Sequence, residues 1–399
     1  MGVRQEPRGP ILVVGGRVVN RKVNAYSLRI NDYSEETKKM APVTRFATPL
    51  WYSPRNMTTL SDIAKDLKVS VVTVSKALRN QGRISVRTRN RVLKRAKELN
   101  YHPNLVARSL VTRRTYTIGL LLPDFTHPFF AEIAKSVAEA VRPRGYHVII
   151  SYFEEDPTLE RAEADSLLSR RVDGLILASS QSPDRLDLFD QLRIRKVPFV
   201  LVDRPVDGVR ASFVGVDNDA IGKLATTHLI ERGCRRIAHL RGPKIGLAAK
   251  RLNGYLASLK KHKLKSHPGH IVDAGFQDLT GYQAMKKLLK SIPIPDGVFC
   301  YNDPVAIGAM RALLEAGLNV PDDVAVVGAG NVHYSDALAV PLTTIDQKTS
   351  QIGARAAELL LEQIESKHPP RLGKILFVPE LVPRKSTQRR LPESRTSAR

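Results

Sequence analysis

The chain has 399 residues, 42% of them hydrophobic and 26% charged, with a formal net charge of +24. This length allows two or three domains, and the composition describes a soluble globular protein. Apolar runs such as residues 118–122 are far too short to span a bilayer, and residues 11–14 are too short for an export signal, so we expect neither a membrane span nor secretion.

The positive charge is concentrated near the N-terminus. Residues 55–115 contain 15 Lys and Arg against 3 Asp and Glu, whereas residues 116–383 contain 33 against 31. A near-neutral body therefore carries a strongly basic head, which is expected of a protein that binds a polyanion.

Residues 1–56 show no sustained hydrophobic period and mix Pro, Gly, Arg and Ser, so we expect disorder there. Met57 stands directly before the first predicted helix. We hypothesise that translation begins at Met57 and that the preceding segment is an upstream extension. The alternative is a basic arm that binds DNA.

Residues 58–78 predict two short helices joined by a three-residue turn. The first has apolar residues at i, i+3, i+4 and i+7 counted from Leu60, and Thr59 and Asp62 form a capping box at its start. The second begins at Ser70, a favourable N-cap. This is the layout of a helix-turn-helix, whose second helix enters the major groove of DNA. The alternative is an ordinary helical hairpin.

Residues 85–100 predict a third helix with a basic outer face, which completes a small domain over residues 57–103. Pro103 ends this pattern. Residues 104–110 predict one or two helical turns, which are too short to be stable alone in water. We therefore expect residues 104–110, within a hinge and linker over residues 104–115, to fold only against a partner.

Residues 116–384 alternate short apolar strands with amphipathic helices. Repeated β-α units of this length predict an α/β fold with parallel sheets covered by helices, and about 270 residues suggest two lobes. Ligands of such sheets bind at the carboxyl ends of the strands, here between the lobes. Residues 385–399 are expected to form a basic, frayed tail.

The sequence contains little that suggests catalysis or metal binding. It lacks a GxxxxGK phosphate loop, a GxGxxG after a strand and a GxSxG elbow, so we expect no enzyme activity and no cofactor. Cys234 and Cys300 are expected to be buried reduced thiols, as suits a reducing cytoplasm. His262, His267 and His270 lie in a Lys-rich loop and are expected at the solvated surface rather than at a metal site.

Several sequence blocks, in one order, resemble the lactose-repressor-like (LacI/GalR) family of bacterial transcription regulators. They are SDIAKDLKVSVVTVSKAL, RTRNRVLKRAKELNYHPNLVARSL, IGLLLPDFTHPFFAEI, RRVDGLIL, VDNDAIG, RLNGY, NDPVAIGAM, VPDDVAVVG and PLTTIDQ, between about residues 58 and 387. The resemblance implies a periplasmic-binding-protein-like core that binds a small effector, commonly a sugar or related metabolite. It also implies a cytoplasmic, nucleoid-associated homodimer or tetramer that binds a pseudo-palindromic operator in double-stranded DNA.

The resemblance also implies which residues contact DNA. Val71, Val72 and Lys76 match base-reading positions; Lys76 can donate to guanine, whereas the two valines offer only apolar surface, for example to a thymine methyl group. In the hinge, Leu110 matches the wedge that opens a base step in the minor groove, and Val106 matches the residue that pairs the two hinges. The other matching positions are Thr59, Ser70, Thr73 and Ser75 in the helix-turn-helix and Asn104 and Ala107 in the hinge.

Six residues match positions that line the family's interlobe cleft: Phe129, Asp203, Arg251, Phe276, Asn302 and Gln347. Aromatic rings can stack on a sugar or a base, and the polar side chains can bond hydroxyls or a carboxylate. Relatives usually carry an acidic residue after a Gly-aromatic pair, where this chain reads Gly328, Ala329, Gly330 and Asn331. An unusual effector, or weak control by one, is therefore plausible, with Asn331 or His333 as a substitute for the acid.

The mechanism implied is an equilibrium between two lobe arrangements. An effector favours one of them, the lobes set the spacing of the two hinges, and effector and DNA are thereby linked reciprocally. Two rival readings are a small-molecule receptor that feeds a transporter, and a DNA-binding protein without effector control.

Overall fold

The computed structural model describes residues 13–14, 17–18, 58–290, 293–366 and 372–389. The chain forms two compact units, residues 1–102 and 103–399. Within residues 1–56 the description covers only β1 (Val13–Val14) and β2 (Arg17–Val18), which pair antiparallel, a pairing that the sequence did not predict. The expectations of disorder and of a start at Met57 otherwise lie outside the described residues.

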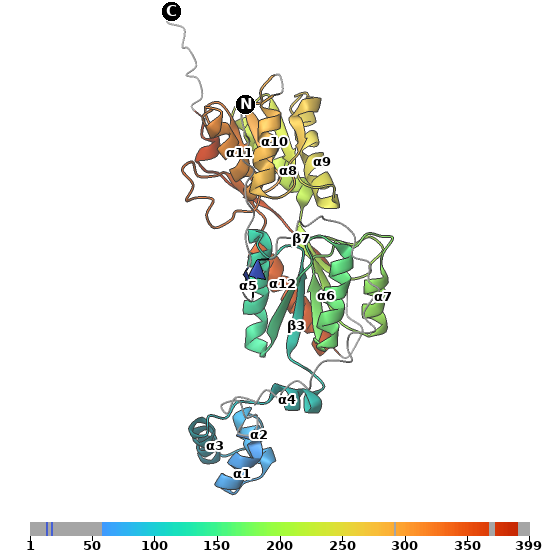
Figure 1. Ribbon diagram of the computed structural model, residues 1–399, viewed down its shortest axis with the longest axis vertical. Coiled ribbons are helices and arrows are strands. Elements are labelled where there is room, and N and C mark those ends of the chain that lie inside the picture. Colours follow the sequence, from blue (N-terminus) through green and yellow to red (C-terminus); the bar gives the residue numbers. More distant parts are fainter. Residues whose placement is uncertain (1–12, 15–16, 19–57, 291–292, 367–371, 390–399) are drawn as a thin grey trace, which may run out of the picture. The chain divides into compact units, whose positions relative to one another are not determined.

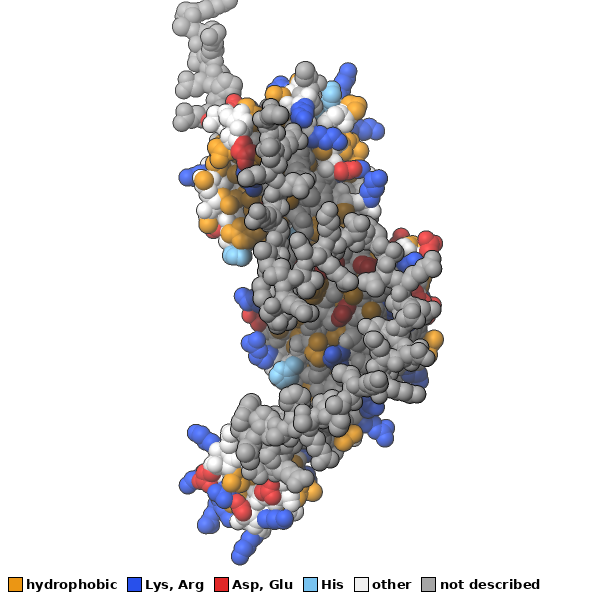
Figure 2. Space-filling view, viewed as in Figure 1, with side chains coloured by type: hydrophobic (Ala, Val, Ile, Leu, Met, Phe, Trp, Pro, Cys, Tyr) orange, Lys and Arg blue, Asp and Glu red, His pale blue; other side chains and the backbone are white. Residues whose placement is uncertain are grey.

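The head unit contains the three predicted helices, α1 (Leu60–Leu67), α2 (Val71–Leu78) and α3 (Val86–Glu98). Thr59 and Asp62 form the predicted capping box, and Ser70 caps α2 by accepting a hydrogen bond from the Thr73 amide. The helices enclose a small core of Ile63, Ala64, Val74, Ala77, Val92 and Ala96. Figure 2 shows Lys and Arg side chains projecting from the surface of this unit.

The hinge segment forms α4 (Leu105–Thr112), whose N-cap Asn104 accepts a hydrogen bond from the Ala107 amide. The helix is present without a partner chain, contrary to our expectation. Local contacts explain this: the Arg108 guanidinium lies 3.6 Å from the Tyr116 ring centroid, and Thr112 Oγ1 bonds the carbonyls of Arg108 and Arg114.

The second unit has two α/β lobes, as predicted (Figure 1). The first lobe is built on a six-stranded parallel sheet in the order β13-β7-β6-β5-β3-β4. Helices α5 (Pro128–Val141) and α12 (Thr349–Glu365) pack together on one face, and α6 (Pro157–Ser169) and α7 (Asp187–Ile194) lie on the other. The strands are β3 (Thr117–Leu122), β4 (His147–Tyr152), β5 (Gly174–Leu177), β6 (Phe199–Val202), β7 (Ser212–Val216) and β13 (Lys374–Phe377).

The second lobe has a four-stranded parallel sheet in the order β11-β10-β8-β9, covered by the helix pairs α8–α9 and α10–α11. Close approach of α8 to α9 requires glycine on both sides: a Cβ on Gly222 would lie 2.1 Å from the Arg251 carbonyl oxygen, and one on Gly254 would lie 2.2 Å from that of Asp219. The elements are α8 (Asn218–Glu231), β8 (Ile237–Arg241), α9 (Gly246–Lys261), β9 (Ile271–Asp273), α10 (Asp278–Leu288), β10 (Gly297–Cys300), α11 (Asp303–Glu315) and β11 (Ala325–Val327).

The chain crosses between the lobes more than once. After β11, it pairs β12 (Thr344–Asp346) antiparallel with β14 (Glu380–Val382), and between them α12 and β13 return to the first lobe. The sequence did not predict β7, β12, β13 or β14. Two of these strands have three residues, β13 is a half-exposed edge strand, and β7 contains Gly215, so none presents a long hydrophobic period.

Three expectations for the surface and the core can be compared with the structure. Cys234 and Cys300 are free and buried, as predicted. His270 is buried, 2% exposed, and its ring bonds the Pro293 carbonyl, so its assignment to the solvated surface was wrong. The predicted tail begins too early: Ser386 and Thr387 are fully buried and bond β11 and Thr343, because the chain end completes the second lobe.

No helix in the described part of the chain combines the length and the apolar character needed to cross a bilayer. Within the same residues, no group of three His, Cys, Asp or Glu side chains is arranged to hold a metal ion.

Candidate DNA-reading helix and effector cleft

The exposed surface of α2 contains the three residues predicted to read bases. Val71 is 44% exposed, Val72 is 61% exposed and Lys76 is also exposed, whereas Val74 and Ala77 on the opposite side enter the core. Apolar side chains that remain this exposed gain burial only when another surface covers them. The structure is therefore compatible with a reading face, although contact with bases stays a prediction.

The neighbouring hydroxyls predicted to contact DNA take part in the local structure of the head. Ser70 Oγ lies 2.8 Å from Thr73 Oγ1, and Thr59 Oγ1 donates to the Asp62 carboxylate, whose pKa is lowered by hydrogen bonds from Thr59. Ser75 Oγ accepts from Arg79. These side chains position the ends of α1 and α2, and any phosphate contact they make adds to that role.

On α4, the predicted groove residues lie on the solvent side: Ala107 is exposed and Leu110 is 74% exposed. The side chain of Val106 lies outside the described residues.

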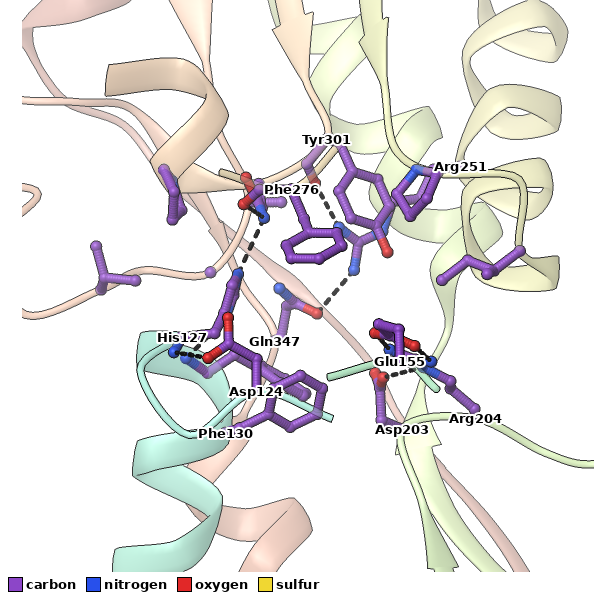
Figure 3. A pocket seen from close by; sticks show the side chains of 18 residues that line it. Asp124, His127, Phe130, Glu155, Asp203, Arg204, Arg251, Phe276, Tyr301 and Gln347 are labelled. Carbon is purple, nitrogen blue, oxygen red and sulfur yellow. Dashed lines mark hydrogen bonds and ion pairs between the residues drawn. The ribbon is translucent and has the colours of Figure 1, made fainter. Parts of the chain in front are cut away.

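In the second unit, a cleft lies between the lobes, and all six predicted effector residues line it (Figure 3). Figure 3 labels Asp203, Arg251, Phe276 and Gln347 around the same space. The structure thus brings together residues that are up to 218 positions apart in the sequence. Their role in binding an effector remains a prediction.

Arg251 is held rigidly at the top of the cleft as Figure 3 shows it. Its Nε donates to Asn218 Oδ1 (2.8 Å), Nη2 donates to Gln347 Oε1 (2.9 Å), and Nη1 donates to the Tyr301 carbonyl. The guanidinium also lies 4.5 Å from the centroid of the Tyr301 ring. All of these hydrogen-bond acceptors are neutral, so they orient the guanidinium without cancelling its charge.

Asn302 links the two lobes. Its Oδ1 caps α11 through the Val305 amide, so its Nδ2 must be the nitrogen that donates to the Phe276 carbonyl (2.8 Å) and faces His127 Nε2 at 3.0 Å. Burial lowers the pKa of His127 to about 4, so the ring is neutral at pH 7, and its Nδ1 accepts a hydrogen bond from the Phe129 amide at the start of α5.

On the wall formed by the first lobe, Asp203 and Arg204 follow β6. Asp203 has a left-handed backbone, φ 61°, and is only 7% exposed. Burial raises the pKa of its carboxyl, while Arg204 and Arg251 oppose that shift. Arg204 binds Glu155 through both terminal nitrogens, at 2.6 and 2.5 Å. At the start of α5, on the same lobe, the Phe129 and Phe130 rings meet edge to face with centroids 5.2 Å apart.

The expected substitute for the missing acid does not line this cleft. Gly330 and Ala329 do, but Asn331 and His333 lie on a neighbouring groove, and Asn331 Oδ1 accepts a hydrogen bond from Arg384. Val332, which lies between them in the sequence, does line the cleft, and replacement of the carboxylate by Asn331 or His333 stays a prediction.

Most of the residues that line the cleft were not predicted from the sequence, although their positions after predicted strands could have indicated them. Almost all of them come within five residues of the carboxyl end of a parallel strand, which is where ligands of such sheets bind. The missed lining residues are Asp124, His127, Phe130, Glu155, Arg204, Pro243, Ile245, Tyr301, Pro304, Ala329, Gly330 and Val332.

Both parts of the chain match known families. Residues 59–104 match bacterial regulatory proteins of the lacI family, and residues 226–387 match a periplasmic binding protein-like domain. The ribose operon repressor of Halalkalibacterium halodurans is 38% identical, over 78% of this chain and 92% of the relative. The HTH-type transcriptional repressor PurR of Pasteurella multocida is 35% identical, over 84% of this chain and 100% of that protein.

A solved structure of a repressor is also similar to most of this chain. The lac repressor dimer bound to operator and the anti-inducer ONPF has a TM-score of 0.73 at 28% identity, over 83% of this chain and 99% of that chain. The named relatives are transcriptional repressors rather than enzymes. With its helix-turn-helix head and two-lobed core, this chain belongs to the LacI family of bacterial regulatory proteins and is a DNA-binding transcription regulator.

Proposed function

We propose that this protein is a cytoplasmic repressor that binds a pseudo-palindromic operator as a homodimer and releases or tightens its hold when a small sugar binds between the lobes. The observation that supports the sugar most directly is the chemistry of the cleft. It combines aromatic faces, Phe129, Phe130 and Phe276, with polar groups that can bond hydroxyls, as in Asp203 and Arg251.

A monosaccharide suits this surface better than an apolar ligand. Each hydroxyl both donates and accepts, so it can bond the buried Asp203 carboxylate and the N–H groups of Arg251 that the protein leaves unused, whereas an apolar ligand can bond neither. The name of the relative from Halalkalibacterium halodurans makes D-ribose the first sugar to test.

The test is calorimetric titration of the full chain with D-ribose and a panel of other monosaccharides, with a purine base as a flat aromatic comparison. We expect a sugar to bind, Phe276→Ala to weaken that binding at least tenfold, and the sugar to change the affinity of wild type for an operator fragment. Phe125→Ala is the matched control, because Phe125 is 51% exposed and does not line the cleft. If no small metabolite binds while operator binding is intact, the protein is a DNA-binding regulator without effector control.

A further inference from the structure

The cleft contains an ion pair whose geometry restricts the charge of its ligand. Glu155 follows β4 and Arg204 follows β6, and the two side chains face each other across the first-lobe wall (Figure 3). Nη1 of Arg204 donates to Oε2 of Glu155 at 2.6 Å, and Nη2 donates to Oε1 at 2.5 Å. The Arg204 side chain is 11% exposed, and that of Glu155 is 31% exposed. This parallel, two-bonded pairing is the strong form of an arginine–carboxylate contact.

We propose that Glu155 is a specificity-determining residue that makes the cleft selective for an uncharged sugar over its phosphorylated or acidic forms. This inference rests on the proposed function, because it assumes that the cleft binds a sugar-like effector. Glu155 acts by occupying both outer nitrogens of Arg204, which a phosphate or carboxylate on the ligand would otherwise bind.

The charges around the cleft support this assignment. Its lining contains three carboxylates, Asp124, Glu155 and Asp203, and two guanidinium groups, Arg204 and Arg251. With Glu155 bound to Arg204, Asp203 and Asp124 remain to oppose the charge of Arg251. A ligand anion would therefore enter a space that is already net negative, where the low dielectric strengthens repulsion.

The two bonds to Glu155 use one N–H on each terminal nitrogen of Arg204, so three N–H groups remain, among them that of Nε. Nε of Arg204 is buried, makes no well-formed hydrogen bond within the described residues, and lies 3.5 Å from Oδ2 of Asp203. A donor and an acceptor this close can share one sugar hydroxyl, which accepts from Nε and donates to the carboxylate. A dianionic phosphate has only acceptors to offer, so it would satisfy Nε and repel Asp203.

The test compares each neutral sugar with its phosphate, using D-ribose with D-ribose 5-phosphate and D-glucose with D-glucose 6-phosphate, by calorimetry on the full chain. Wild type is expected to bind the neutral member of a pair at least 100-fold more tightly. Glu155→Gln keeps the shape of the side chain but removes its charge, and we expect it to shift this ratio at least tenfold toward the phosphate. The double variant Glu155→Gln, Arg204→Gln should lose that shift, because it lacks the released guanidinium.

Glu154→Gln is the matched control. The adjacent Glu154 is exposed and does not line the cleft, so the same chemical change should leave the ratio unaltered. The wild-type ratio tests the inference even where a variant does not fold: equal or tighter binding of a phosphate overturns it and leaves effector control standing. An unchanged ratio in folded Glu155→Gln likewise overturns the role of Glu155. If neither the sugar nor its phosphate binds in any pair, both this inference and the proposal of a sugar effector are overturned.

Discussion

Replacement of Leu110 by alanine tests whether the exposed face of α4 binds DNA. Leu110 is 74% exposed in the single chain, so its removal should change the free energy of unfolding by no more than about 0.5 kcal/mol. In the proposed complex this side chain is buried between base pairs. Its truncation would then weaken operator binding while leaving the fold intact.

The magnitude follows from the exposed apolar surface. Leucine to alanine removes three carbon atoms, and burial of each contributes about 0.8 kcal/mol, which gives about 2.4 kcal/mol. Only the 74% of the side chain that is exposed can be newly buried by DNA, so the lost binding energy is about 1.8 kcal/mol for one hinge. For the two hinges of a dimer it is about 3.6 kcal/mol. Affinity should therefore fall roughly 400-fold, at about 1.4 kcal/mol for each factor of ten.

The assay is fluorescence anisotropy with an operator fragment recovered by genomic footprinting, at one fixed salt concentration because phosphate contacts make affinity depend on salt. Energy transfer between dyes at the fragment ends reports DNA bending. Leu314→Ala is the matched control, since Leu314 is 77% exposed on α11, and it should bind and bend DNA like wild type. Unchanged affinity and bending in Leu110→Ala would refute the wedge.

Three further predictions concern the reading face, helix packing and acid stability. Val72→Gln should change operator preference in a binding selection, because an amide can bond adenine where valine offers only apolar surface; an unaltered preference would contradict base reading by Val72. Gly254→Ala should lower the free energy of unfolding by about 1–3 kcal/mol, because the new Cβ would lie 2.2 Å from the Asp219 carbonyl oxygen. Urea titrations measure this change, and unchanged stability would show that α8 and α9 move apart easily. Burial lowers the pKa of His239 to about 4, so the unfolded chain takes up a proton there before the folded chain does. Stability should therefore fall from about pH 6.5 to pH 4, by up to about 3 kcal/mol for this residue, and His239→Gln should make the fall shallower; an equal slope in both proteins would show that His239 does not contribute.

The elements that the sequence predicted correctly are those whose evidence is local. The capping box at Thr59, the N-cap at Ser70 and the hydrophobic period of α1 each depend on residues within one or two helical turns. The alternation of strands and helices likewise reflects the burial of each element against its own sheet. Short elements such as β12 contain too few residues to show a period, and β13 has only one half-buried face.

The residues that line the cleft depend instead on contacts between distant parts of the chain. The six predicted lining residues came from resemblance to a family. Glu155 and Arg204, which form a two-bonded ion pair in the cleft lining, had no distinguishing pattern in the sequence. They are 49 residues apart and meet because β4 and β6 end at the same edge of one sheet. Likewise, the contact between His127 and Asn302 exists only because the two lobes close on each other.

By itself, the sequence predicted the basic helix-turn-helix head and the two-lobed α/β core, because charge, caps and hydrophobic periods are properties of neighbouring residues. The family came from the resemblance of several sequence blocks in one order. Only the tertiary structure decided which strand ends converge, that Asn331 bonds Arg384, and that Glu155 binds Arg204. These features depend on sheet order and chain crossing, which bring together side chains that local interactions do not relate.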